Sequence, residues 1–196
     1  MGIPVADGAE IAGSNLAHYV FAVMAVRTIL HYPDPRLREK ARPVAEITPA
    51  IQQLVDDMAE TMYAAPGVGL AATQIGEAHR VFVIDTANED EPSKLRVFIN
   101  PEIVARDGEV TWEEGCLSFP TVVEEIDRAE KVRVRALDRE GKQFELDCDG
   151  LLAVAVQHEL DHLDGVLMID RMGALKKRIV DRKMRRRAES RASSAR

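Results

Sequence analysis

The pattern His-Glu-Leu-Asp-His at residues 158–162 restricts the fold of this chain more than any other feature of its sequence. It follows the apolar run 151–156, which indicates a buried helix. Residues i and i+4 of a helix share one face, so His158 and His162 can hold one metal ion, and Glu159 can reach a water on that ion. The alternative is a polar helix end with two surface histidines. Burial of the apolar run argues against it, because the run would carry this polar set into the interior.

Two histidines do not complete a metal site, and the chain beyond them lacks the third ligand that metallopeptidases use. In one large group of these proteases the third histidine would stand where this sequence has Met168. In another group a downstream helix supplies a glutamate, but the only glutamate after Glu159 is Glu189, in a basic tail. A metallopeptidase of the His-Glu-x-x-His type is therefore an alternative that lacks one ligand.

Cys116 is the candidate for the third ligand. It lies in the turn Glu-Glu-Gly-Cys-Leu-Ser at 113–118, directly after a predicted strand. One cysteine and two histidines leave a fourth coordination position open, which is typical of catalytic metal sites. The alternative is a small core cysteine. The chain has two cysteines, too few for a disulfide framework, and their scarcity fits a reducing cytosol; we treat Cys148 as a bystander.

A glycine-rich turn at 67–74 reads Gly-Val-Gly-Leu-Ala-Ala-Thr-Gln. It lacks the Lys-Ser/Thr pair of a phosphate-binding loop, and no predicted strand precedes it. Small residues such as Gly69 let the backbone approach another group closely, and Gln74 offers an amide donor. A close-packed turn without any ligand is the competing interpretation.

The order of predicted elements indicates an α+β fold, with mostly antiparallel β-sheets packed around a central helix that bears the His-Glu-x-x-His pattern. An N-terminal helix begins with Thr48 as N-cap and Pro49 in its first turn, and it stops at the Pro-Gly pair 66–67. Gly141 marks a hairpin, and a C-terminal helix is expected at 173–187. The central helix is predicted at 150–162, and strands at 80–85, 96–100, 109–113, 131–137 and 143–147.

Charge is unevenly distributed along the chain. Segment 171–196 carries 11 Lys or Arg and 2 Asp or Glu, a net +9, whereas the other residues carry 15 and 31, a net −16. This predicts one local electrostatic contact and no DNA binding, and no apolar run reaches the roughly 18 residues of a membrane span. We expect a catalytic domain at 24–172 and a basic C-terminal helix and tail at 173–196. Residues 1–23, without Lys or Arg, are expected to be a disordered extension or a non-native start.

The glycine-rich turn, the cysteine turn and the histidine helix together resemble the peptide deformylases, whose motifs are GxGLAAxQ, EGCLS and HExxH. This chain matches all three motifs in the family's order, and the similarity covers residues 24–187. No single motif decides the family, whereas the three together are highly specific. The chain departs from the family at Phe119, a usually aliphatic position, and at 121–125, where we expect an altered rim of the substrate cleft.

The resemblance implies a cytoplasmic hydrolase that removes the formyl group from the N-terminal formylmethionine of nascent proteins and releases formate. It implies Cys116, His158 and His162 as metal ligands. It also implies iron(II) as the physiological metal, with zinc, nickel or cobalt able to substitute, although ligand chemistry alone suits zinc at least as well. In the implied mechanism a metal-bound hydroxide attacks the formyl carbon, and Glu159 is the general acid/base.

The resemblance also assigns residues to the substrate. The Leu117 backbone N–H and the Gln74 side chain are expected to donate hydrogen bonds to the formyl oxygen. Gly69 should present its backbone to a peptide that lies extended like an added strand. Val154 and Ala155, with Leu117, are candidate walls of the methionine pocket, and core packing is an equal alternative for all three.

Several interpretations stay open on the sequence alone. Arg128 either braces Glu114 behind the metal site or is an ordinary surface charge. The basic tail either docks at the ribosome, where substrates emerge, or is a solvated helix with a disordered end. We expect a monomer. An inactive binding module stabilised by its metal is the last alternative, and the presence of Glu159 and Gln74 argues against it.

Overall fold

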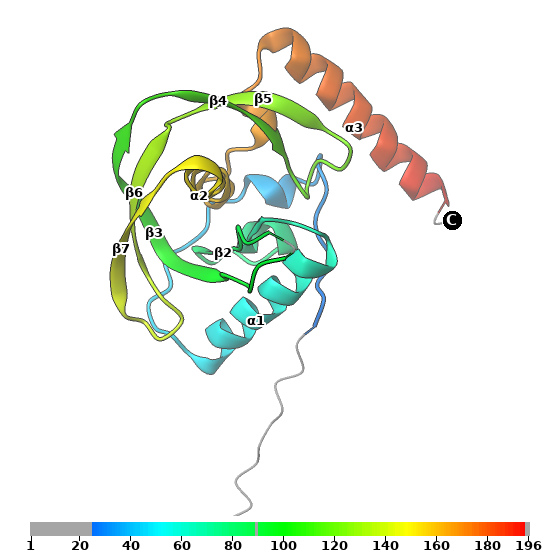
Figure 1. Cartoon of the computed structure of the whole chain (residues 1–196). Helices are drawn as coiled ribbons and strands as arrows, with labels where there is room; N and C mark the ends of the chain where they lie inside the picture. Colours follow the sequence, from blue (N-terminus) through cyan, green and yellow to red (C-terminus); the bar gives the residue numbers. More distant parts are fainter. Residues whose placement is uncertain (1–24, 89, 195–196) are drawn as a thin grey trace, which may run out of the picture.

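Antiparallel strands form two sheets in the computed structural model, which describes residues 25–88 and 90–194 (Figure 1). Within this part, a five-stranded sheet has the order β1-β2-β3-β6-β7, and β4 pairs with β5 in a separate hairpin. The predicted α+β fold is confirmed, and the predicted extension at 1–23 lies outside the described residues. The strands are β1 (Gly69–Ala71), β2 (Val81–Ile84), β3 (Arg96–Asp107), β4 (Val110–Gly115), β5 (Val123–Arg128), β6 (Lys131–Leu137) and β7 (Gln143–Cys148).

Three α-helices accompany the sheets. In α1, Thr48 is the N-cap, its hydroxyl accepts the Ile51 N–H, and Pro49 occupies the first turn, as predicted. The last helix continues to Ser194, beyond its predicted end at 187. None of the helices in the described part is both long and apolar enough to cross a membrane. The helices are α1 (Pro49–Ala64), α2 (Gly150–Leu163) and α3 (Ala174–Ser194), with short 3-10 turns η1 (Pro35–Arg38), η2 (Ala72–Ile75) and η3 (Met168–Asp170).

Strand β2 is covered on both faces, which explains its four consecutive apolar residues. Val81 and Val83 belong to the hydrophobic cluster formed with α1. Phe82 and Ile84 point to the other face and belong to the cluster formed with α2. All four side chains are fully buried. Because side chains alternate along a strand, the two helices cover opposite faces of the sheet at this position.

Helix α2 is buried on nearly all sides. Every residue from 153 to 160 is buried, so the helix is enclosed around most of its circumference instead of along one stripe. Val156, Leu160 and Leu163 pack in the cluster shared with the five-stranded sheet. The polar residues on the remaining surface of α2, which include both histidines, therefore face the interior of the protein.

Two strands of the structure are absent from the prediction. β5 pairs with β4 along its whole length, with Trp112 opposite Ile126 and Glu114 opposite Glu124. Its sequence, Val-Glu-Glu-Ile-Asp-Arg, is dominated by charged residues, so its strand pattern is weak. β1 is only three residues long and lies within the glycine-rich turn. Both strands form by pairing with another strand, which their own local sequence does not reveal.

Gln157 connects α2 to the turn between β5 and β6. Its side-chain amide donates to the Ala129 carbonyl oxygen at 2.9 Å and accepts the Ala129 N–H at 3.0 Å, as a neighbouring strand would. The Gln157 side chain is buried. Gln157 thus supplies hydrogen-bond partners for the N–H and the C=O of Ala129, which lies outside the helices and strands.

We predict that Gln157→Ala lowers the free energy of unfolding by about 2 kcal/mol, because the Ala129 N–H and C=O lose their partner in a buried place. Urea denaturation followed by circular dichroism measures this change. The control is Gln143→Ala on the exposed side of β7, for which we expect a change within about 0.5 kcal/mol. Equal losses in the two variants would contradict the role of Gln157.

Candidate metal centre and active site

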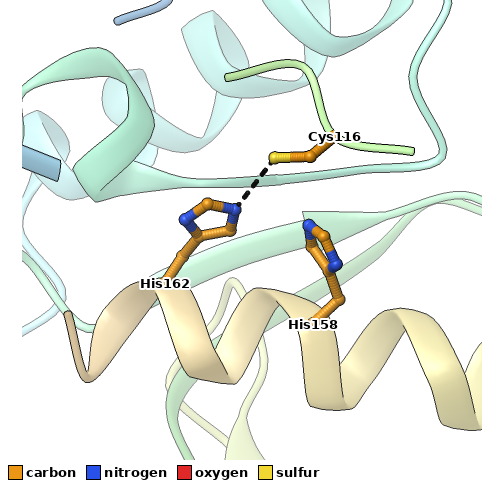
Figure 2. A group of neighbouring side chains, drawn as sticks. All are labelled: Cys116, His158 and His162. Atoms are coloured by element: carbon orange, nitrogen blue, oxygen red, sulfur yellow. Dashed lines mark hydrogen bonds between the residues drawn. The ribbon is translucent and has the colours of Figure 1, made fainter. Parts of the chain in front are cut away.

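The three predicted metal ligands meet at one point (Figure 2). His158 and His162 project from one face of α2, a helical turn apart, and Cys116 reaches them from the turn after β4. The Cys116 Sγ lies 3.3 Å from the His162 Nε2. One ligand atom from each residue lies within 4.8 Å of the other two. Both histidines are buried and Cys116 is half-buried.

The chemistry of these donors fits a divalent transition-metal ion. One thiolate sulfur and two imidazole nitrogens are typical ligands of such ions, and three protein ligands leave a position open. Burial holds the pKa of His162 well below its usual range, which keeps the imidazole neutral, as a ligand must be. Burial also disfavours a charged His158, but its contacts with Cys116 and Glu114 outweigh this and raise its pKa. The groups around His158 therefore stabilise a positive charge at this position, and a bound metal cation would supply that charge.

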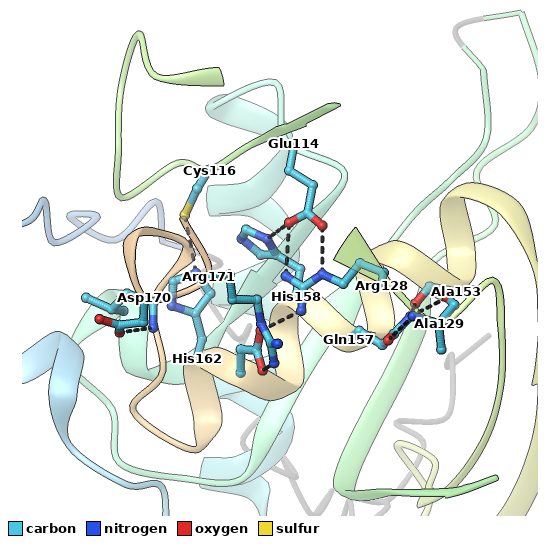
Figure 3. A network of polar contacts seen from close by, with 12 residues as sticks. Glu114, Cys116, Arg128, Ala129, Ala153, Gln157, His158, His162, Asp170 and Arg171 are labelled. Carbon is cyan, nitrogen blue, oxygen red and sulfur yellow. Dashed lines mark hydrogen bonds and ion pairs between the residues drawn. The ribbon is translucent and has the colours of Figure 1, made fainter. Parts of the chain in front are cut away.

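His158 is oriented by an ion pair behind the cluster (Figure 3). Its Nδ1 lies 2.7 Å from the Glu114 Oε2, which leaves the Nε2 to face the other ligands. Arg128 donates to both oxygens of Glu114, at 2.7 and 3.0 Å. Burial raises the pKa of Glu114, but the hydrogen bonds from His158 and Arg128 prevail and hold it at about 2. Arg128 is itself only 5% exposed, so it braces Glu114 and is not an ordinary surface charge.

Asp161 extends this network, a role that was not predicted from the sequence. Its carboxylate accepts hydrogen bonds from Arg128 and, through both oxygens, from Arg171. Asp161 stands next to His162 on α2, so the network spans both histidine positions of the helix. The sequence signal was its place inside the His-Glu-x-x-His pattern, three residues after His158 and therefore near the same face.

Glu159 is buried beside the cluster with a free carboxylate oxygen. Its Oε2 has no hydrogen-bond partner among residues 25–88 and 90–194. Burial raises the pKa of Glu159 to about 7, which suits a group that both takes and gives a proton near neutral pH. Its other oxygen packs against Gly69, where an added Cβ would lie 2.5 Å from the Glu159 Oε1. Gly69 is therefore required by close packing against this carboxylate.

Gln74 is fixed so that its amide nitrogen points to the cluster. Its Oε1 accepts the Ala71 N–H at 2.8 Å. Its Nε2 lies 3.1 Å from the Ser118 Oγ and 3.7 Å from the Cys116 Sγ. Gln74 is buried, and it lines the same cleft as Leu117. The Gln74 amide thus reaches the cluster from a different segment of the chain than Cys116 and Leu117.

A cleft of about 500 Å³ gives access to the cluster. The predicted substrate residues Gly69, Leu117, Val154 and Ala155 all line it, together with Cys116, His158 and Glu159. Ala155 lines the cleft and also belongs to the hydrophobic cluster between α2 and the sheet, so it has a packing role in the core as well. The cleft walls therefore include much of the predicted substrate site.

Further walls of the cleft were not predicted. Trp112 and Leu151 line it, and so does the segment 119–123, which overlaps the residues 121–125 where an altered rim was expected. Trp112 lies two residues before Glu114 and so shares its face of β4. Leu151 precedes Val154 by three residues and shares a face of α2. These spacings were present in the sequence and identify both residues once the cleft is located.

Comparisons with known proteins agree with this geometry. The family model described as Polypeptide deformylase matches residues 26–178. A peptide deformylase of Chromobacterium violaceum is 52% identical over 164 residues, which cover 84% of this chain and 97% of that protein. One of Alkalilimnicola ehrlichii is 55% identical over 161 residues, covering 82% and 90%. The crystal structure of a peptide deformylase from Legionella pneumophila has a TM-score of 0.80 and 47% identity, covering 86% of this chain and 98% of its own.

The matched range contains the glycine-rich turn, the cysteine turn and the whole of α2, so it contains every residue of the cluster and its surroundings. The length of the match and its identity are far above what a shared fold alone would give. The chain belongs to the polypeptide deformylase family.

Proposed function

We propose that the cluster of Cys116, His158 and His162 is the centre at which this chain removes the formyl group from the N-terminal formylmethionine of nascent proteins. Family membership supports the activity, in which one water breaks the formamide C–N bond to give formate and a free amine. One observation carries the assignment of the centre. A Cys-His-His set with two buried histidines lies together, and two of its members share one cleft with Glu159, whose Oε2 has no partner among the described residues.

Cys116, His158 and His162 would hold a single divalent ion, with His158 contributing its Nε2 because its Nδ1 binds Glu114. We propose iron(II) as the physiological ion; zinc, nickel or cobalt fits the same donors. When bound, such an ion lowers the pKa of a water molecule and polarises a carbonyl oxygen. The support for an ion at this place is the donor set and its burial.

Glu159 would move the proton. Its carboxylate takes the proton that the attacking water loses and then gives it to the nitrogen of the departing amine. The carboxylate ends the cycle in its starting form, so one residue serves as base and then as acid. The pKa of about 7, raised by burial, supports both roles at neutral pH.

Two donors would stabilise the negative charge that develops on the formyl oxygen. These are the Leu117 backbone N–H and the Gln74 Nε2. Preorganised donors of this kind each contribute about 3 kcal/mol to transition-state stabilisation. The hydrogen bond from the Ala71 N–H to the Gln74 Oε1 supports this role, because it holds the amide with its nitrogen toward the cluster.

The peptide would lie extended along β1. This strand is at the edge of the five-stranded sheet, so it has a free side for an added strand, and Gly69 is its first residue. Val154, Ala155 and Leu117 offer an apolar pocket for the methionine side chain. The small Gly69 lets the peptide approach Glu159 closely.

We further propose a cytoplasmic monomer that docks at the ribosome through α3. Support comes from the strongly basic composition of α3 and from two exposed apolar side chains, Leu175 and Ile179, at 74% and 59% exposure. The acidic remainder of the chain would point away from ribosomal RNA.

We predict that Glu159→Gln lowers kcat/KM at least about 100-fold without loss of metal, because the amide has the shape of the acid but transfers no proton. The assay follows formate release from a formyl-Met peptide under anaerobic conditions, with metal analysis. Glu140→Gln, in the exposed β6–β7 turn, is the control and should match the unmodified protein. Retention of activity in Glu159→Gln would refute the proton-transfer role, and no turnover by the unmodified, metal-loaded protein would refute the function.

We predict that Gly69→Ala lowers kcat/KM by about 100-fold, because the new methyl group would displace the Glu159 carboxylate from its position. Steady-state kinetics with the same peptide measures the loss. Gly173→Ala is the matched control, since an added Cβ there meets no atom within 4 Å, and its kcat/KM should stay within about twofold. Full activity of Gly69→Ala would show that the contact with Glu159 has no catalytic importance.

A further inference from the structure

One wall of the substrate cleft is the segment that leads from the cysteine turn into β5, where Val123 and Glu124 are the first paired residues. Residues 119–122 connect the cysteine turn to β5, and together with Val123 they line the cleft. We call residues 119–124 the rim segment. Phe119 and Val122 are buried, whereas Val123 is 56% exposed at the mouth of the cleft. The rim segment thus forms the outer part of the wall, and what holds it in place decides the shape of the mouth.

Helix α3 supplies the apolar support for the rim segment. Its Val180 and Met184 are buried in one hydrophobic cluster with Phe119, Val122 and Ile126. Val180 and Met184 are four residues apart and lie on one face of the helix. The opposite side of α3 is exposed (Figure 1). The face of α3 that carries Val180 and Met184 therefore packs against the rim segment and supports this wall of the cleft.

Two lysines on the same helix add polar contacts to the rim segment. The Lys183 Nζ donates to the Thr121 carbonyl oxygen at 2.7 Å. The Lys176 Nζ lies 2.9 Å from the Glu124 Oε2. The two lysines are seven residues apart, which is two helical turns, so both project from one side of α3. From there Lys183 reaches Thr121 and Lys176 reaches Glu124.

Tyr32 makes a third connection between the rim segment and α3. Its ring stacks on Phe119 with centroids 5.0 Å apart and an angle of 18°. Its hydroxyl donates to Asp181 at 2.6 Å, and the Arg185 guanidinium lies 5.9 Å from the ring centroid. Phe119 is the residue that departs from the aliphatic family pattern, and its aromatic ring is what Tyr32 stacks on.

The backbone of the rim segment needs such support. Thr121 has a φ of 66°, in the left-handed region that favours glycine and is unfavourable for a β-branched residue. A backbone in this conformation persists where surrounding contacts hold it. The carbonyl of this same residue accepts the Lys183 hydrogen bond.

We propose that Lys183 and Lys176 are positioning residues for the substrate cleft: by holding the rim segment, they set the affinity for peptide residues that follow the formylmethionine. This rests on the proposed function. The exposed position of Val123 places the rim at the mouth, away from the ligands on α2, so it meets later residues of an extended peptide. Single exposed ion pairs contribute little, so both lysines must be changed together to reveal the effect.

The experiment compares Lys176→Met/Lys183→Met with the unmodified full-length protein. Methionine keeps the length of the side chain and removes the ammonium group. The substrates are formyl-Met-Ala-Ser amide and formyl-Met methylamide; neither has a carboxylate that lysines could attract. For the longer peptide we expect KM to rise about fivefold with kcat within about twofold, and for the short substrate we expect neither to change by more than about twofold.

Two further variants, each checked by thermal denaturation, distinguish the positioning role of the lysines from a general effect of lost charge or of lower protein stability. Lys40→Met/Lys131→Met removes the same charge at exposed sites outside the rim segment and outside α3, and it should leave KM unchanged. Lys176→Arg/Lys183→Arg restores a cationic donor and should recover most of the affinity. Thermal denaturation of each variant checks that the fold is intact.

The proposal is overturned if KM for the longer peptide is unchanged, if KM rises equally for both substrates, or if the Lys40 and Lys131 control shows the same rise. It is also overturned if kcat falls in step with thermal stability. Turnover of the formylated peptide by the unmodified protein is measured in the same series. Its absence would count against the proposed function, whereas its presence without a KM effect would count against the positioning role alone.

Discussion

The structure depends on keeping two imidazoles and a carboxylate of one helix inside the protein. Burying such groups is costly unless each has a partner. His158 finds one in Glu114, and the negative charge of Glu114 is balanced by the guanidinium of Arg128. His162 lies against Cys116. Two buried atoms of these groups, the Glu159 Oε2 and the His162 Nδ1, keep no hydrogen-bond partner among the described residues. The carboxylate oxygen is the one that the proposed chemistry uses.

Much of this site was predictable because it is encoded at short range. One helical turn places His158 and His162 on one face, and this spacing alone indicates a metal. Elimination then favoured Cys116, since the chain offers neither histidine nor glutamate where metallopeptidases need one. The helix start at Thr48-Pro49 and the hairpin at Gly141 were equally local, and the structure confirms both.

The parts that escaped prediction depend on contacts between distant segments. β5 was missed because its charged sequence gains its strand form only by pairing with β4. The role of Arg128 stayed undecided because its two acidic partners come from β4 and α2, and only the folded chain brings them together. The backing of the cleft by α3 has the same origin: Lys183 and Thr121 are 62 residues apart. Composition showed that α3 is basic but not that its inner face supports the cleft.

The central claim is that Cys116, His158 and His162 hold one ion, and X-ray absorption at the metal edge tests it most directly. For protein loaded with one zinc ion per chain, we expect one sulfur at about 2.3 Å and two imidazole nitrogens at about 2.0–2.1 Å. The sulfur signal should disappear in Cys116→Ser and persist in Cys148→Ser. A spectrum without sulfur, or one whose sulfur depends on Cys148, would contradict the account.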